Sequence, residues 1–128
     1  MEANLITGII VDSSIKIHST IGPGCYERVY EELLYFELHQ RNLNVKRQIT
    51  MPITYEALHI NDAYKLDLLI EDKVVVEIKS VEHLLPVHFK QLNTYLKLMN
   101  LKHGMLLNFK VDLMKDGIHK VFNNFCTE

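Results

Sequence analysis

The stretch Ala63–Ser80 constrains the fold of this chain more than any other, because apolar and polar residues alternate through it on both sides of a short polar turn. A period of two is typical of β-strands, and the turn over 71–73 predicts that two antiparallel strands form a hairpin. Their apolar faces must lie on one side of the sheet, since a slip of one residue would turn over every side chain of one strand. We expect this shared face to consist of Tyr64, Leu66, Leu68, Ile70, Val74, Val76 and Ile78.

A turn centred on Asp72 sets the register of the hairpin and places Asp67 opposite Glu77, and Lys65 opposite Lys79. Cβ atoms of directly opposed residues lie roughly 4.5–5.5 Å apart, so two carboxylates at these positions repel each other. The pair becomes favourable when a divalent cation lies between them, and Mg²⁺ and Mn²⁺ prefer oxygen ligands. Glu-x-Lys alone is typical of a solvated strand face, but the register adds a lone aspartate, which favours a metal site.

Lys79 adds a positive charge beside the two carboxylates, because it follows Glu77 by two residues and shares its strand face. Its ammonium could hold an attacking water or neutralise a phosphate oxygen. A divalent cation would make hydroxide available near neutral pH and would stabilise the charge of the transition state. These roles together fit the hydrolysis of a phosphodiester better than any other common reaction.

The other segments predict how the hairpin is enclosed. Apolar residues at helical spacing predict three helices, over 4–20, 25–41 and 86–100. Alternation or short apolar runs predict further strands or hairpin arms, over 43–51, 53–60, 104–109 and 118–122, with a hairpin turn at 115–117. We therefore expect an α/β (α+β) fold, in which helices flank a mixed central β-sheet, and a single domain over residues 1–128.

Composition limits the function classes. The chain is 48% hydrophobic and 23% charged, which is typical of a globular protein. No apolar run approaches the ~18 residues of a membrane helix, and the N-terminus does not resemble a signal peptide, so we expect a cytoplasmic protein without a membrane partner. The net charge of -2 counts mildly against nucleic-acid binding, although acidic metal ligands lower this count. Neither Cys25, Cys126 nor the histidines have metal-binding spacing.

Two motifs resemble a known family. Asp67 followed after nine residues by Glu77-Ile78-Lys79 resembles the PD-(D/E)xK nuclease signature, with Leu66 where that signature has proline. The segment GCYERVY, over 24–30, matches the GxxExxY signature of a family placed in the same nuclease-like superfamily. This resemblance covers most of the chain, and it implies a restriction-endonuclease-like αβββαβ core, preceded here by an extra N-terminal helix.

The resemblance also implies the site and its chemistry. It implies a nuclease that depends on Mg²⁺ or Mn²⁺ and acts on nucleic acid, with DNA favoured. The metal ligands would be Asp67, Glu77, the Ile78 carbonyl and Glu27. A glutamate in the first turn of a helix also stabilises the helix dipole, and Glu31, one turn further along the same face, competes with Glu27 for the ligand role.

The third predicted helix adds two residues to the implied site. Gln91 and Tyr95 match the QxxxY motif of RecB-type nucleases, in which this pair supports the active site and contacts the DNA strand. At a spacing of four they lie on one helical face. By itself the motif is also typical of any amphipathic helix, but its position directly after the Glu-x-Lys strand strengthens the resemblance.

Two other functions compete with the nuclease. One is a catalytically silent nuclease-fold domain that binds nucleic acid or a protein partner, which the acidic balance favours and the intact set of Asp67, Glu77 and Lys79 disfavours. The other is a structural protein whose apolar helices form an oligomer interface. A homodimer would suit a nuclease as well, because two sites can cut both strands of a duplex.

Overall fold

Helices and strands follow one another along the chain in the predicted order. The structure is a computed structural model, and it describes residues 1–126. Within these residues the elements are α1 (Ala3–Ile21), α2 (Glu27–Gln40), β1 (Val45–Tyr55), β2 (Leu58–Ile70), β3 (Val74–Lys79), α3 (Pro86–Met99), β4 (His103–Asn108), the 3₁₀ helix η1 (Met114–Gly117) and β5 (Ile118–Phe122). The strands form one mixed sheet in the order β1-β2-β3-β4-β5, in which only β3 and β4 are parallel. The predicted fold class is confirmed.

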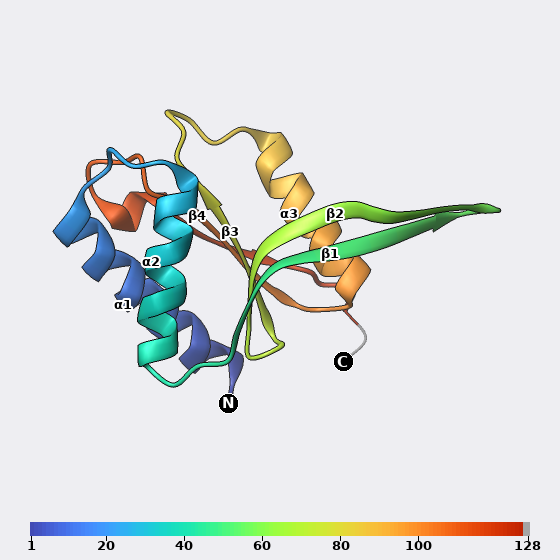
Figure 1. Cartoon of the computed structure of the whole chain (residues 1–128), viewed down its shortest axis with the longest axis horizontal. Helices are drawn as coiled ribbons and strands as arrows, with labels where there is room; N and C mark the ends of the chain where they lie inside the picture. Colours follow the sequence, from blue (N-terminus) through green and yellow to red (C-terminus); the bar gives the residue numbers. More distant parts are fainter. Residues whose placement is uncertain (127–128) are drawn as a thin grey trace.

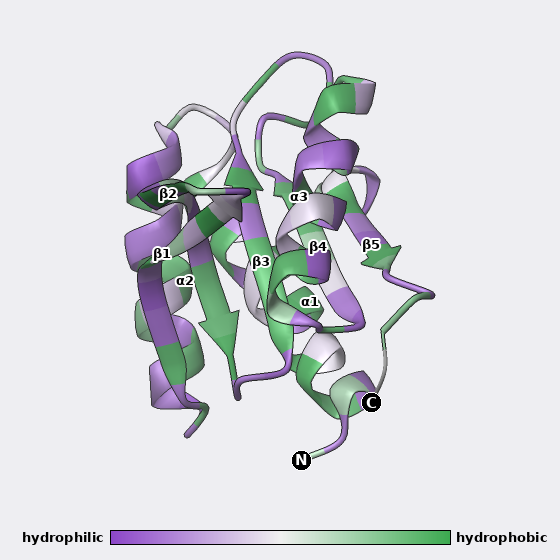
Figure 2. Cartoon of the chain, turned by 90° about the vertical axis from the view of Figure 1, so that its right-hand side faces the viewer, coloured by the Kyte–Doolittle hydropathy of each residue, from purple (hydrophilic) through white to green (hydrophobic). Residues whose placement is uncertain are grey.

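The sheet is covered on both faces (Figure 1): α1 and α2 lie on one side and α3 on the other. Each side has its own apolar core. The α1/α2 core includes Ile10, Leu34, Leu68, Val76 and Leu107. The α3 core includes Leu66, Leu69, Val75, Leu92 and Leu106. Figure 2 shows that hydrophobic residues dominate β3 and β4, which α3 covers in that view.

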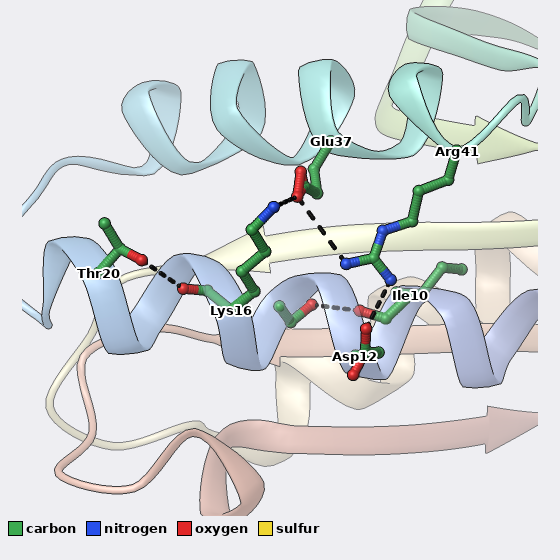
Figure 3. Close-up of polar contacts among 7 residues, drawn as sticks. Ile10, Asp12, Lys16, Thr20, Glu37 and Arg41 are labelled. Atoms are coloured by element: carbon green, nitrogen blue, oxygen red, sulfur yellow. Dashed lines mark hydrogen bonds and ion pairs between the residues drawn. The ribbon is translucent and has the colours of Figure 1, made fainter.

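Charged side chains join α1 to α2 along their exposed side (Figure 3). Lys16 of α1 binds Glu37 of α2, and the Arg41 guanidinium lies 2.6 Å from an Asp12 oxygen and 3.8 Å from a Glu37 oxygen. Glu37 is buried between the helices, and a buried carboxylate is stable when cations and hydrogen bonds match its charge. These contacts hold α2, and the acidic residues on it, against the rest of the fold.

The link between the two helices is held by Tyr30. Its hydroxyl donates a hydrogen bond to the Gly22 carbonyl at 2.6 Å and accepts one from the Cys25 N–H at 3.1 Å. Gly22 has φ +83, a left-handed conformation that ends α1 and favours glycine. The Tyr30 ring stacks on Phe109 with 4.3 Å between ring centroids. The start of α2 is therefore fixed relative to the end of β4.

The β1–β2 hairpin is longer than the rest of the sheet and projects away from the body of the molecule (Figure 1). β1 is an edge strand, and its register with β2 shifts between Met51 and Ile53, on either side of Pro52. Proline lacks a backbone donor, so an edge strand or an irregular position is where a sheet accepts it. The predicted break at this proline is thus a local shift of register inside one strand.

Three local predictions were wrong. Tyr64 and Leu66 do not share a face with Leu68, because they pack in the α3 core and Leu68 belongs to the α1/α2 core. The arm predicted over 53–60 is not one element, since it contains the turn between Tyr55 of β1 and Leu58 of β2. The third error, the direct pairing of Asp67 with Glu77, concerns the site. The turn predicted over 115–117 lies in the connection between antiparallel β4 and β5, where it forms part of the 3₁₀ helix η1.

Candidate active site

The strands β2 and β3 separate at the acidic residues. Their pairing covers Leu68–Val76, Leu69–Val75 and Ile70–Val74, which is the predicted register, and it ends there. Asp67 and Glu77 are therefore not paired across a ladder as predicted, nor is Lys65 paired with Lys79. Each carboxylate instead binds the other strand's backbone: the Asp67 N–H donates to Glu77 Oε2 at 2.7 Å, and the Ile78 N–H donates to Asp67 Oδ2 at 2.8 Å. These two bonds replace the ladder and bring both acids into one site.

Glu77 is buried and Asp67 is half-buried, and both have little compensating charge. Glu77 is 4% exposed, and burial, followed by repulsion from Asp67, raises its pKa from 4.5 to about 8. Burial also raises the pKa of Asp67 above its usual value. The positive charge of Lys79 lowers the pKa of both acids and so opposes these shifts. The two acids thus form a centre of negative charge that Lys79 balances only in part.

Glu31 brings a third acid to the site from α2. It is 7% exposed, and burial together with repulsion from Asp67 raises its pKa. The side-chain amide of Gln48, on β1, donates hydrogen bonds to Glu31 Oε1 and, at 3.4 Å, to Asp67 Oδ1. Arg47 Nη2 lies 3.6 Å from Glu31 Oε2 but also binds Glu32. Glu31 is therefore linked to Asp67 through a neutral amide.

Glu27, the other predicted helix carboxylate, lies at the rim. It is the first residue of α2, is exposed, and accepts a long hydrogen bond of 3.4 Å from the Ser80 N–H at Oε2. Its negative charge still contributes to the raised pKa values of Asp67 and Glu77. Both helix glutamates thus approach the site, Glu31 as a buried neighbour of Asp67 and Glu27 as an exposed one.

The end of β3 is held in place by its neighbours. The Lys79 carbonyl accepts a hydrogen bond from the Phe109 N–H at 3.0 Å, and the Ser80 hydroxyl donates to the Cys25 carbonyl at 2.9 Å. The side chain of buried Asn108 accepts from the Val81 N–H and donates to the Val81 carbonyl, at 3.1 and 2.9 Å. The backbone that carries Lys79 is therefore rigidly positioned beside the acids.

The third helix contributes Tyr95 and leaves Gln91 outside. Tyr95 is buried, and its ring meets Tyr64 edge-on with centroids 5.5 Å apart. Burial, together with the negative charges of Glu77 and Asp67, raises the pKa of Tyr95 to about 12, so its hydroxyl stays protonated at neutral pH. Gln91 is exposed on the preceding turn, and within residues 1–126 no hydrogen bond joins it to the other predicted site residues.

A pocket of about 450 Å³ opens beside Asp67, on the side of the sheet that α2 covers. Its lining mixes acids, cations and one amide: Glu27, Arg28, Glu31, Glu32, Arg47, Gln48, Lys65 and Asp67. Arg28 and Lys65 are exposed, and neither forms an ion pair with another residue in 1–126. The pocket therefore offers free cations next to the acidic centre.

Sequence reasoning missed Gln48, Arg28 and Lys65 as candidate site residues. Gln48 was one polar residue among several on an alternating strand, and no motif marks it. A weak signal existed for Arg28, which lies directly beside Glu27 inside the GxxExxY segment. Lys65 is two residues before Asp67, so it was within reach of the same argument that selected Lys79.

The donor atoms at the site are carboxylate, amide and carbonyl oxygens, which are the ligands of hard divalent cations. Within residues 1–126, no group of three or more His, Cys, Asp and Glu side chains is placed to hold a metal ion by itself. In the same residues, no helix has the combination of length and apolar content that crossing a bilayer requires.

Comparison with known families agrees with this geometry. A family model described as PD-(D/E)XK nuclease superfamily matches residues 4–121. No curated protein matches the chain significantly. The matched range contains every residue of the candidate site, from Glu27 on α2 to Tyr95 on α3.

Proposed function

Because the chain belongs to the PD-(D/E)XK nuclease superfamily, we propose that it is a metal-dependent nuclease that hydrolyses phosphodiester bonds, with DNA as its substrate. The observation that carries the proposal is the separation of β2 from β3 at Asp67 and Glu77. There the buried Glu77 and the half-buried Asp67 each accept a hydrogen bond from a backbone N–H of the opposite strand, and Lys79 follows two residues after Glu77. Burial of like charges in this way costs free energy, and a bound cation would remove that cost.

Nucleases of this superfamily generally use divalent metal ions, and the residues of the site fit such an ion. The Asp67 and Glu77 carboxylates, with the Ile78 carbonyl, offer the oxygen donors that Mg²⁺ and Mn²⁺ prefer. Mg²⁺ usually takes one or two carboxylates and keeps several waters, which agrees with a site that has no ready cluster of three acids. Such an ion would supply an activated water and stabilise charge on the phosphate. Glu27 would lie at the outer edge of its coordination.

The other side chains act on the water, on the acids or on the nucleic-acid strand. The Lys79 ammonium holds the attacking water or neutralises a phosphate oxygen as charge develops. The protonated hydroxyl of Tyr95 helps to orient the acidic pair from the α3 side. Gln91, exposed one turn earlier, is free to contact the nucleic-acid strand. Arg28 and Lys65 bind neighbouring phosphates, since Lys and Arg supply most of the sequence-independent affinity for nucleic acid.

The assembly that we propose is a single domain that works as a homodimer. One site cleaves one strand, and two sites related by a two-fold axis suit the two strands of a duplex. Sedimentation or light scattering of the chain with and without duplex DNA tests this part independently of catalysis.

The experiment that tests the function is cleavage of plasmid and single-stranded DNA with Mg²⁺ or Mn²⁺, beside calorimetric titration of Mn²⁺ into the protein. The variants are Asp67→Asn, Glu77→Gln and Lys79→Ala. The matched control is Asp72→Asn, which changes an exposed aspartate at the far end of the same hairpin, at a φ of +54 that asparagine tolerates.

We expect the wild type and D72N to cleave DNA and bind Mn²⁺. D67N and E77Q should lose both, and K79A should keep Mn²⁺ binding while losing cleavage. A well-folded wild type that binds no Mn²⁺ and cuts no DNA would overturn the proposal and favour a nuclease fold that only binds nucleic acid or a protein partner.

A further inference from the structure

Gln48 has an unusual backbone conformation for its place in a strand. It lies within β1 yet has φ +48, a left-handed and strained value that non-glycine residues rarely adopt. The neighbouring pairs Arg47–Leu68 and Ile49–Leu66 are intact, so between Val45 and Met51 the ladder of β1 with β2 skips only the position where Gln48 lies across from Asp67. Such strain persists only where surrounding contacts hold it, and it gathers at functional sites.

Two hydrogen bonds of the side-chain amide accompany this strain. Gln48 Nε2 donates to Glu31 Oε1 on α2 and to Asp67 Oδ1 on β2. An amide nitrogen carries two hydrogens and can serve two acceptors. Because Glu31 is buried and comes from a different layer of the fold, Gln48 is the group that joins the helix carboxylate to the sheet carboxylate.

The neutrality of this bridge matters as much as its geometry. A lysine or arginine at this position would neutralise the two acids and compete with a divalent cation for them. The nearest guanidinium, that of Arg47, binds Glu32, lies over the Tyr35 ring 4.7 Å from its centroid, and has Nη2 3.6 Å from Glu31 Oε2. The amide therefore holds two carboxylates together without adding a positive charge of its own.

We propose that Gln48 is a positioning residue, which holds Glu31 and Asp67 in one arrangement for catalysis and for the divalent ion of the site. This inference rests on the proposed nuclease function. It adds Glu31, which Gln48 links to Asp67, to the acids that influence binding of the ion. It also gives the strained backbone of β1 at Gln48 a role in the reaction. Gln48 itself touches neither the substrate nor the reacting atoms.

The test uses Gln48→Gly, because glycine adopts a positive φ freely and the variant removes the amide without forcing another side chain into a strained backbone. The matched control is Glu56→Gly, at φ +53 in the exposed turn of the same hairpin. Each protein is titrated with Mn²⁺ by calorimetry, assayed for kcat and KM on DNA, and melted without metal. Gln48→Glu, which keeps the shape and removes the donors, is the third variant.

For Q48G we expect Mn²⁺ affinity to fall about tenfold and kcat to fall about 10- to 100-fold, as for other groups that orient metal ligands. KM should change little, and Tm should stay within a few degrees of the wild type. Q48E should lose at least as much activity as Q48G, since it adds a like charge between two acids. E56G should match the wild type in affinity and kcat.

Two outcomes overturn the inference, and they are distinguishable. If the wild type binds Mn²⁺ and cleaves DNA but Q48G does both equally well, only the role of Gln48 is lost. If the wild type itself neither binds Mn²⁺ nor cleaves, the nuclease function fails, and the role of Gln48 fails with it.

Discussion

Two glutamates on the same helix, Glu37 and Glu31, are buried to the same degree but differ in the charges that surround them. Glu37 is 8% exposed and Glu31 is 7% exposed. Glu37 has two cations, Lys16 from α1 and Arg41 one turn along α2 (Figure 3). Glu31 faces another acid, Asp67, receives its hydrogen bond from a neutral amide, and shares the Arg47 guanidinium, 3.6 Å away, with Glu32. A buried glutamate therefore joins two helices at position 37, whereas at position 31 it adds to a cluster of negative charge.

The difference separates the residues that build the fold from those that serve the site. A buried carboxylate is stable when its charge is matched, and it costs free energy when it lies near a like charge. A fold tolerates such conflicts mainly at functional sites. Around Glu37 the charges nearly cancel. Around Glu31, Asp67 and Glu77 three acids share Lys79 and part of Arg47, so the region remains poised to bind a cation.

The strongest way to test this contrast is to remove one acid from each region and measure DNA cleavage. Glu77→Gln should reduce kcat by about 100-fold or more, because it removes both a metal ligand and developing-charge stabilisation. Glu37→Gln should leave kcat within about twofold, since its charge is already matched by Lys16 and Arg41. Steady-state cleavage with Mn²⁺ checks this. Equal losses in the two variants would remove the distinction between the regions.

The pH dependence of stability gives a second contrast. The pKa of Glu77 is 4.5 when unfolded and about 8 when folded, so the folded state binds the proton more tightly. Its contribution to stability is fully present below about pH 4.5 and is lost as pH rises through about 8. Without metal, the free energy of unfolding should fall over this window by up to about 1.4 kcal/mol per pH unit.

Urea unfolding in a chelator, across this range, measures the effect. Glu77→Gln should flatten the curve and make the protein more stable than the wild type near pH 8, because the amide carries no charge to bury. The Glu37→Gln variant should keep the wild-type slope. A wild-type curve that is flat, or that rises with pH across the window, would contradict the account of Glu77.

Much of the scaffold around the site follows from the sequence. Val74, Val76 and Ile78 do share one face of β3, and the register of the hairpin near its turn is the predicted one. The α3 helix begins at Pro86 as expected. These features could be predicted because strand alternation, turn length and a first-turn proline are local properties of the sequence. Packing in the two cores then stabilises the same pattern of apolar residues.

The site itself is only partly readable from sequence. Direct pairing of Asp67 with Glu77 assumed that the ladder continues, whereas the ladder ends at Leu68–Val76 and both carboxylates bind backbone N–H groups beyond it. Nothing in the sequence marks Gln48 as a residue of positive φ, because its strain is imposed by tertiary contacts. The choice between Glu27 and Glu31 depends on how α2 is rotated against the sheet, which helical spacing cannot determine.

A third contrast concerns the free energy of unfolding at neutral pH, with an expected change of about 1–2 kcal/mol. Glu37→Gln should destabilise the metal-free protein by this amount, because Arg41 loses a buried partner while exposed Lys16 loses little. Glu31→Gln should be neutral or stabilising, since it removes repulsion from Asp67. Its kcat should nevertheless fall. Chemical unfolding with a chelator checks the pair, and destabilisation of both proteins to the same extent would show that Glu31 is as well compensated as Glu37.

The smallest effect should come from Asp12, at the solvent end of the same α1–α2 contacts. Its carboxylate lies 2.6 Å from Arg41 Nη1, but the side chain is 73% exposed. Exposed pairs contribute about 0.2–1 kcal/mol and are weakened by salt. Asp12→Asn should therefore cost about 0.5 kcal/mol at low salt and almost nothing at high salt, with cleavage unchanged. A loss well above 1 kcal/mol would mean that the exposed pair of Asp12 with Arg41 contributes as much to stability as the buried Glu37. Burial would then not explain the stabilising role of Glu37.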